Sequence, residues 1–346
     1  MSARLEALAA RLEEPLLVTD LTNVAYLTGF HSSNAAVLVE PRGGATVYTD
    51  FRYIEVARGL DGVEVELVAG SLMRHLAGKL SGRVRFEAGA LTYADWQILD
   101  GGGAELVPAG GLVEELRAVK DEEEIAAIRR TARIADRAFE ALTAETWVGR
   151  TERELAWRLR ELLHAHGADE LSFDTIVASG PNGALPHAVP TDRLVEPRTL
   201  VTVDWGARVD GYCSDCTRTV STGGLPDRLR EIYDLCLAAQ ERAVAGIRPG
   251  LSGVEADAIA RDVIEEAGYG ACFGHGLGHG VGMAIHEAPR LSRDSESTLA
   301  AGQIVTIEPG IYLEGVGGVR IEDLAVVRDG GVELLTSFPK QLVTVS

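Results

Sequence analysis

Residues 273–287 read FGHGLGHGVGMAIHE and bring together five glycines and three histidines: His275, His279 and His286. Imidazole is a common metal ligand, and it changes its charge near neutral pH, so it also suits proton transfer. Closely spaced glycines weaken a helix but let the backbone approach a ligand or an ion. A flexible loop without a function is the plainer interpretation of this segment. The combination of residues favours a metal site or an acid–base site.

The overall composition is that of a globular protein with two domains. The 346 residues are 46% hydrophobic and 25% charged, and chains of this length usually divide into more than one domain. The formal net charge of −19 argues against binding to a nucleic-acid backbone. No stretch approaches the roughly eighteen uncharged apolar residues of a membrane span, and the charged N-terminus does not resemble a signal peptide. We therefore expect a cytoplasmic protein that binds neither membranes nor nucleic acids.

The cysteines do not indicate a disulfide framework, because there are only four and they are scattered. Cys213 and Cys216 form a CxxC motif. A structural zinc site would normally need a second pair of ligands at similar spacing, and the sequence has no second CxxC. We therefore do not expect zinc binding or redox chemistry at this pair.

The first third of the chain has the pattern of an α/β domain. Short β-branched runs bounded by turn residues predict strands over 15–19, 35–39, 45–49, 63–68 and 83–87, and helical spacing appears over 52–58 and 72–80. Apolar residues three and four apart then predict a long helix over 120–143, and its acidic start suits a helix N-terminus. We place the domain boundary just before this helix, which gives an N-terminal domain of residues 1–115 and a second domain of residues 116–346.

Two similar stretches in the second domain indicate an internal duplication. Residues 199–204 read TLVTVD and residues 303–308 read QIVTIE. Each is an apolar β-run that ends in a carboxylate, and glycines and a second strand-like run follow each of them. These second runs are residues 212–219 and 319–327. The pattern predicts a curved sheet or half-barrel built from two related halves.

Four acids occupy equivalent places in the two halves: Asp204, Asp215, Glu308 and Glu322. Taken singly, each acid could be a helix cap, a surface charge or one half of an ion pair. Buried together they would repel one another, and two divalent cations would offset that repulsion. With one histidine from residues 273–287 the donor set is rich in oxygen and suits Mn²⁺, Co²⁺ or Fe²⁺, with Zn²⁺ also possible. Two such ions can activate a bridging water, which predicts a hydrolase.

Several short blocks of the chain together form a distinctive pattern. They read VD at 203–204, SDCTR at 214–218, GHGLGHG at 274–280, HE at 286–287, IEPGIY at 307–312 and GVRIED at 318–323. These blocks resemble the aminopeptidase P and prolidase family, the Xaa-Pro metallopeptidases with the pita-bread fold. SGPNGALPH at 179–187 is similar to the family's additional histidine segment, and NVAYLTGF at 23–30 is similar to the start of its N-terminal domain.

The resemblance covers nearly the whole chain and implies a fold. It implies a mixed α/β (α+β) protein in which a creatinase-like N-terminal α/β domain precedes a pita-bread metallopeptidase catalytic domain. The catalytic domain would contain a curved antiparallel sheet with pseudo-twofold symmetry.

Carried over by position, the resemblance implies five metal ligands: Asp204, Asp215, His279, Glu308 and Glu322. Asp215 and Glu322 would bridge two divalent ions per chain. Mn²⁺ is the first expectation for these ions, and Co, Fe or Zn would suit the same donors. Glu308 would also accept a proton from the nucleophilic water.

The same resemblance implies contacts to a substrate. His187 and His286 would bind the peptide and stabilise the tetrahedral intermediate, and His275 would line the site. Arg320 would orient Glu322 or meet a substrate carboxylate, whereas a surface arginine is the plainer alternative.

The implied activity is hydrolysis of the Xaa-Pro bond at the N-terminus of a peptide by a hydroxide that bridges two metals. This bond is a tertiary amide without an N–H, so a general peptidase handles it badly. We expect an Xaa-Pro aminopeptidase that forms a homodimer, with an Xaa-Pro dipeptidase on the same scaffold as the alternative. A methionine aminopeptidase, a metal-free creatinase and a non-catalytic binding module fit less well, because the N-terminal domain and all five ligands are present.

Overall fold

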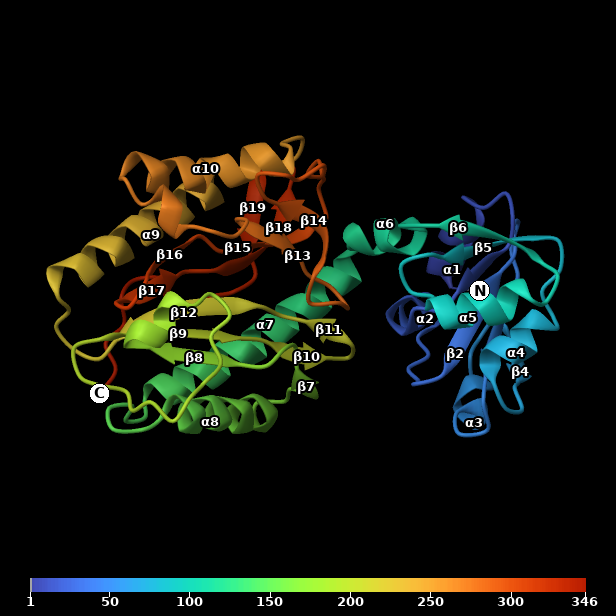
Figure 1. Ribbon diagram of the computed structural model, residues 1–346, viewed down its shortest axis with the longest axis horizontal. Helices are drawn as coiled ribbons and strands as arrows, with labels where there is room; N and C mark the ends of the chain where they lie inside the picture. Colours follow the sequence, from blue (N-terminus) through green and yellow to red (C-terminus); the bar gives the residue numbers. More distant parts are fainter. Residues whose placement is uncertain (1) are drawn as a thin grey trace. The chain divides into compact units, whose positions relative to one another are not determined.

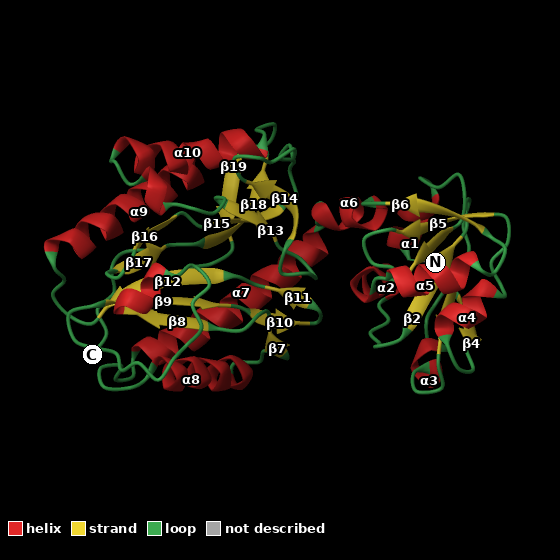
Figure 2. Cartoon of the chain, in the orientation of Figure 1, coloured by secondary structure: helices red, strands yellow, loops and turns green. Residues whose placement is uncertain are grey.

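The chain, in a computed structural model that describes residues 2–346, divides into two compact units. One unit reaches to Arg117 and the other is Ala118–Ser346. Both combine helices with strands (Figures 1 and 2). Every helix within residues 2–346 is too short or too polar to span a bilayer.

The N-terminal unit is built on a six-stranded sheet with the strand order β4-β3-β2-β1-β5-β6. Strand β1 pairs antiparallel with β2 and parallel with β5, so the sheet is mixed. Its strands are β1 (Leu16–Val18), β2 (Ala35–Val39), β3 (Ala45–Thr49), β4 (Glu64–Leu67), β5 (Arg83–Glu87) and β6 (Glu105–Ala109). The helices are α1 (Ala3–Ala9), α2 (Leu21–Thr28), α3 (Ile54–Ala57), α4 (Leu72–Ala77), α5 (Tyr93–Asp100) and α6 (Leu112–Ala118).

Strand β6 contains a proline, which is unusual in a strand. Pro108 pairs with Phe86 as part of β6. Because β6 lies at the edge of the sheet, the missing N–H of proline does not break an internal ladder.

The second unit contains two antiparallel sheets that carry the candidate site, in the orders β12-β9-β8 and β14-β13-β15-β18-β19. Two smaller sheets have the orders β11-β10-β7 and β16-β17. The first half has the strands β7 (Glu170–Leu171), β8 (Ile176–Ser179), β9 (Leu200–Trp205), β10 (Ala207–Val209), β11 (Tyr212–Cys213) and β12 (Cys216–Ser221). The second half has β13 (Gly278–Gly280), β14 (Glu287–Leu291), β15 (Ile304–Ile307), β16 (Gly310–Leu313), β17 (Gly317–Arg320), β18 (Asp323–Arg328) and β19 (Gly331–Leu334).

Three of the four α-helices of the second unit begin at a side-chain capping box. They are α7 (Glu122–Thr143), α8 (Glu152–Ala165), α9 (Asp227–Gly246) and α10 (Gly253–Glu266), with the short 3₁₀ helices η1 (Gly180–Ala184) and η2 (Gly270–Cys272). At the start of α7, the Asp121 side chain accepts from the backbone N–H of Glu124, and the Glu124 side chain accepts from that of Asp121. This capping box satisfies two otherwise unpaired N–H groups and explains why the long helix begins close to its predicted start.

The duplication predicted from sequence appears as two antiparallel strand pairs. Strand β9 pairs with β12, and β15 pairs with β18. The second run of each half was predicted as one continuous strand, and this was wrong in both halves. The first run breaks at Asp215, between β11 and β12, and the second breaks at Glu322, between β17 and β18. Both acids therefore lie at strand interruptions, where the backbone can turn them towards a common point.

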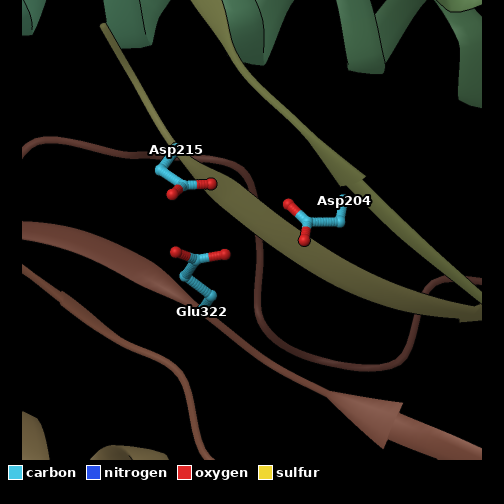
Figure 3. Close-up of side chains that lie close together, drawn as sticks. All are labelled: Asp204, Asp215 and Glu322. Atoms are coloured by element: carbon cyan, nitrogen blue, oxygen red, sulfur yellow. The ribbon is translucent and has the colours of Figure 1, made fainter. Parts of the chain in front are cut away.

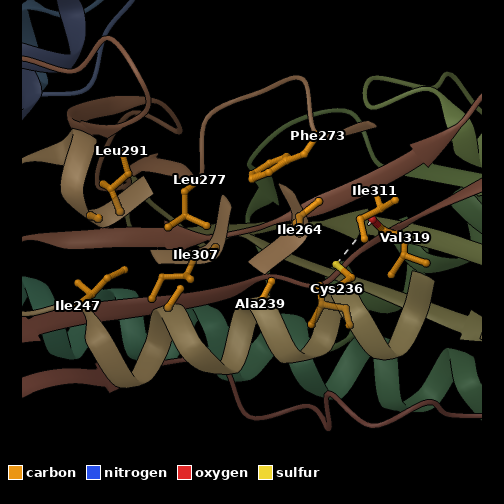
Figure 4. Packing of buried hydrophobic residues seen from close by; sticks show 14 of the residues in the cluster. Cys236, Ala239, Ile247, Ile264, Phe273, Leu277, Leu291, Ile307, Ile311 and Val319 are labelled. Atoms are coloured by element: carbon orange, nitrogen blue, oxygen red, sulfur yellow. Dashed lines mark hydrogen bonds between the residues drawn. The ribbon is translucent and has the colours of Figure 1, made fainter. Parts of the chain in front are cut away.

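Helices α9 and α10 cover one face of the second half and bury its largest apolar cluster (Figure 4). Cys236 and Ala239 on α9 lie in this cluster with Ile307, Ile311 and Val319 from the strands. Full burial of an aliphatic side chain contributes about 1.5–3 kcal/mol relative to exposure. This packing fixes the strand β15, which leads directly into Glu308.

Candidate metal centre

Three carboxylates from separate parts of the second unit point towards one another (Figure 3). Asp204 lies on β9, while Asp215 and Glu322 lie at the two strand breaks. One carboxylate oxygen from each lies within 4.8 Å of the others. The fold therefore brings Glu322 to two acids that precede it by more than a hundred residues.

His279 and Glu308 complete the same cluster. The Nε2 atom of His279 is 3.7 Å from Oδ2 of Asp215 and 3.4 Å from Oε1 of Glu308. The hydroxyl of Thr306 donates to Oε1 of Glu308 at 3.0 Å and accepts from the backbone N–H of His279 at 3.0 Å. All five residues that the sequence suggested as ligands are thus gathered in one place.

Two of the glycines beside His279 are required by close backbone contacts. A Cβ atom on Gly278 would lie 2.1 Å from the carbonyl oxygen of Thr306, and one on Gly280 would lie 2.1 Å from that of Ala288. A side chain at either position would therefore push β13 away from its neighbours. The glycines let the strand that carries His279 approach β14 and β15 closely.

Burial and mutual repulsion of the carboxylates favour the binding of a positive charge in the cluster. Burial, and then the charges of Glu322, Asp204 and Glu308, raise the pKa of Asp215 well above its ordinary value. Burial, followed by the charges of Glu308 and Asp204, does the same to the pKa of Glu322. Oδ1 of Asp204 and Oε1 of Glu322 are buried and accept no hydrogen bond from any described residue. Buried carboxylate oxygens without donors fit divalent cations, so the residues present match the group that the sequence implied.

Arg320 is buried beside the cluster, which rules out the surface arginine that the sequence left open. Its Nη2 atom donates to Oδ2 of Asp204 at 2.7 Å, and its Nε atom donates to the hydroxyl of Thr217 at 3.0 Å. That hydroxyl donates in turn to Oε2 of Glu322 at 2.7 Å. Nη1 donates to the hydroxyl of Tyr312 at 3.0 Å. Arg320 thus holds Asp204 directly and Glu322 through Thr217. A contact between Arg320 and the substrate stays a prediction.

Three further histidines, His187, His275 and His286, line a cavity of about 900 Å³. The five clustered residues line the same cavity. The ring of His286 lies edge-on to that of His279, with 4.3 Å between the ring centroids. His187 is exposed on the cavity lining. His275 is half-buried, and its Nε2 atom lies 2.8 Å from the hydroxyl of Tyr312. Burial lowers the pKa of both His275 and His286, which favours their neutral forms.

Arg290 lines this cavity as well, and the sequence interpretation missed it. It pairs with His279 across β13 and β14, which places it beside the cluster. Its guanidinium is exposed and makes no hydrogen bond or ion pair with any residue from 2 to 346. The short distance in sequence from His286 was the available signal, but a single arginine near a motif is usually a solvated charge.

The CxxC cysteines take no part in the cluster. Cys213 and Cys216 are buried free thiols, and burial raises the pKa of both. A protonated, inaccessible thiol is a poor nucleophile and a poor metal ligand. That the pair is neither a redox nor a zinc site stays a prediction.

Comparison with known proteins identifies the family. Residues 126–329 match the model of metallopeptidase family M24, and residues 4–119 match the Creatinase/Prolidase N-terminal domain. The chain belongs to metallopeptidase family M24. The predicted fold, a creatinase-like domain followed by a pita-bread catalytic domain, is thereby confirmed, as is the prediction of a metallopeptidase. Membership of this family implies a bound divalent metal, in agreement with the carboxylate cluster.

Three proteins show how similar this M24 chain is to known peptidases. An uncharacterized peptidase of Bacillus subtilis is 44% identical over 335 residues, which is 95% of each chain. The structure of an Xaa-Pro dipeptidase from Bacillus anthracis is 40% identical, covers 99% of both chains and gives a TM-score of 0.95. That of an X-Pro aminopeptidase from Thermotoga maritima is 34% identical, covers 96% of this chain and 97% of that chain, and gives a TM-score of 0.89.

Proposed function

We propose that this M24 chain is an Xaa-Pro dipeptidase that depends on two divalent cations. The observation that carries the proposal is the convergence of four carboxylates and one imidazole on a cavity that also holds an unpaired guanidinium. The dipeptidase from Bacillus anthracis is more similar in sequence and structure than the aminopeptidase from Thermotoga maritima, which supports dipeptides as substrates. These similarities favour a dipeptidase, which was the alternative expected from the sequence, over the first expectation, an aminopeptidase.

In this proposal Asp204, Asp215, His279, Glu308 and Glu322 hold the two ions. When bound, such ions supply Lewis-acid polarisation and lower the pKa of water. Mn²⁺ is the proposed ion because the donors are mainly carboxylates. Assembly as a homodimer and a cytoplasmic location stay predictions from the family resemblance.

Glu308 is proposed to carry a proton from the nucleophilic water to the leaving nitrogen. It would accept a proton from the nucleophilic water and return it to the prolyl nitrogen as the peptide bond breaks. Burial raises the pKa of Glu308, which brings the carboxylate closer to the range in which it can both take and release a proton. The prolyl nitrogen must be protonated for the bond to break, because an amine leaves far more readily than the corresponding anion.

His286 and His187 are proposed to contact the substrate on the open side of the cluster. His286 lies against His279, and His187 is on the exposed lining of the cavity. Both would donate hydrogen bonds to the oxygen on which negative charge develops. His275 would line the site, with its ring position fixed by Tyr312.

Arg290 is proposed to bind the free carboxylate of the proline residue. In an Xaa-Pro dipeptide the proline residue ends in a free carboxylate. In a longer peptide the same carbonyl group forms an amide bond to the next residue. An exposed guanidinium that has no partner among residues 2–346 suits a carboxylate, because two parallel hydrogen bonds can form. Arg290 would therefore favour dipeptides over longer peptides.

The substitution Arg290→Met tests this assignment. We expect it to raise KM for an Xaa-Pro dipeptide by roughly tenfold or more, the cost of losing a hydrogen-bonded charge pair. Hydrolysis of the C-terminal amide Xaa-Pro-NH₂ should hardly change, because that substrate has no carboxylate to lose. Arg293→Met is the matched control, since Arg293 is exposed, pairs with Glu265 and does not line the cavity. An equal loss on both substrates would remove Arg290 from carboxylate recognition.

A further inference from the structure

A buried ion pair lies next to the candidate site and takes no part in the mechanism described above. The Nζ atom of Lys120 is 2.5 Å from Oε1 of Glu287, and their side chains are 1% and 6% exposed. Ionised groups are costly to bury, and the attraction between the two charges offsets part of that cost. Glu287 directly follows His286, which is proposed to contact the substrate.

The Lys120 end of the pair is fixed to the strand that leads to Glu308. The backbone N–H of Lys120 donates to the carbonyl of Gly302 at 2.9 Å, and Val119 forms a β-bridge with Gln303. Gly302 has a φ of +88°, and a Cβ atom there would lie 3.1 Å from the carbonyl oxygen of Lys120. This tight contact ties the segment before α7 to the turn that opens β15.

The Glu287 end of the pair is fixed to the strand that carries His279. Glu287 begins β14 and pairs with Gly280, at a register shift that immediately follows His279. Its carboxylate covers Gly282, because a Cβ atom at Gly282 would lie 2.2 Å from Oε1 of Glu287. The backbone on either side of His286 is therefore held by the strand pairing and by this carboxylate.

His286 lies in the bend before β14, and Glu287 is the first residue of that strand. His286 packs edge-on against His279, while the Glu287 side chain reaches the ammonium of Lys120. A shift of Glu287 would move the main chain of His286 and change the spacing of the two rings. The ion pair is thus placed to set the position of His286 without contacting the reacting atoms.

We propose that Lys120 and Glu287 are positioning residues that hold His286 against His279, in the position from which His286 would donate to the oxygen that gains negative charge. This inference rests on the proposed function only for the role of His286. The pair joins the backbone before β15 to that at the start of β14, and so links the segments that present Glu308 and His286.

The test compares Lys120→Met, Glu287→Gln and the double variant that combines them. Each single variant leaves one buried charge without the partner it has in the wild type, so both should unfold at lower temperature. Each should also lower kcat for an Xaa-Pro dipeptide by about tenfold or more, because a misplaced contact group costs this much. KM should hardly change, since Arg290 is proposed to set it, and the content of bound Mn²⁺ should match the wild type.

The double variant separates positioning from simple stabilisation. With both charges removed, the unfolding temperature should recover towards that of the wild type, whereas kcat should stay low because nothing holds His286. Recovery of kcat together with stability would overturn the proposal, and so would unchanged kcat in both single variants. Arg150→Met is the matched control, because Arg150 pairs with Glu145 away from the cavity. It should leave kcat unchanged.

A crystal structure of Lys120→Met supplies a readout that does not depend on activity. We expect the rings of His286 and His279 to move apart, and an unchanged ring pair would contradict the positioning role. A wild-type enzyme that fails to cleave Xaa-Pro dipeptides would disprove the proposed function, and this ring geometry would still test the ion pair.

Discussion

Replacing Glu308 with glutamine is expected to lower kcat for an Xaa-Pro dipeptide by roughly 10³-fold, within the range for loss of a general acid–base group. Glutamine keeps the shape of the side chain and one carbonyl oxygen, but it cannot take a proton from water or return one to the prolyl nitrogen. The measurement is the initial rate at saturating dipeptide, with the Mn²⁺ content of the variant determined on the same sample.

Metal content decides how this result is interpreted. A variant that retains nearly all of its Mn²⁺ and loses activity supports proton transfer by Glu308, whereas loss of the ion would show that Glu308 acts mainly as a ligand. Glu314→Gln is the matched control, because Glu314 is exposed in the turn between β16 and β17. Turnover within tenfold of the wild type for Glu308→Gln would remove Glu308 from the chemistry.

Removing the metal is expected to abolish hydrolysis, and adding Mn²⁺ or Co²⁺ should restore it. The reason is the buried cluster of Asp204, Asp215 and Glu322, whose carboxylate oxygens lie within 4.8 Å of one another. Without cations these oxygens repel one another, and the Lewis acid for the peptide carbonyl is missing. The measurement is the rate after dialysis against a chelator, followed by titration with each ion. Full activity after verified metal removal would contradict the proposal.

The metal-free protein should also show a characteristic dependence of stability on pH. The pKa values of Asp215 and Glu322 are raised in the folded chain, so the folded state holds more protons than the unfolded state. Stability is therefore expected to fall as the pH rises above the ordinary carboxyl range of about 4. Bound cations offset the same charges, so the rise in unfolding temperature on adding Mn²⁺ should be larger at pH 8 than at pH 5. A rise that is larger at pH 5 would show that the cluster does not hold the ion.

Local sequence patterns predicted the regular elements well. The strands over 35–39, 45–49 and 83–87 have the predicted bounds, because β-branched runs between turn residues carry a local signal. Helix α7 begins at a capping box, which is also local. The edge strand β6 was missed because proline normally argues against a strand, and only its place in the sheet makes it tolerable.

The strand breaks at Asp215 and Glu322 could not be predicted from periodicity. Strand-forming residues lie on both sides of each break, and the interruption depends on contacts with distant parts of the chain. One such contact is the hydrogen bond from Thr217 to Glu322, which spans 105 residues. Long-range contacts of this kind leave no signal in a local pattern.

The candidate ligands were accessible from sequence, whereas the residues that support them were not. Acids at the ends of apolar runs are unusual, and this pattern indicates a function for Asp204 and Glu308. The ion pair of Lys120 with Glu287 joins residues 167 apart, and each charge alone is typical of a surface. A role of Arg290 in substrate binding could not be predicted from sequence, because it depends on the position of its side chain in the cavity.

The dipeptidase assignment is tested by comparing kcat/KM of the Mn²⁺-loaded wild-type enzyme on three substrates: Xaa-Pro, Xaa-Pro-Yaa-Zaa and Xaa-Ala, with the same first residue throughout. We predict that Xaa-Pro is cleaved at least roughly tenfold better than the tetrapeptide, because only the dipeptide offers Arg290 a carboxylate next to proline. Xaa-Ala should be the poorer dipeptide. Cleavage of the tetrapeptide as fast as Xaa-Pro would contradict the dipeptidase assignment, and equal cleavage of Xaa-Ala would contradict specificity for proline.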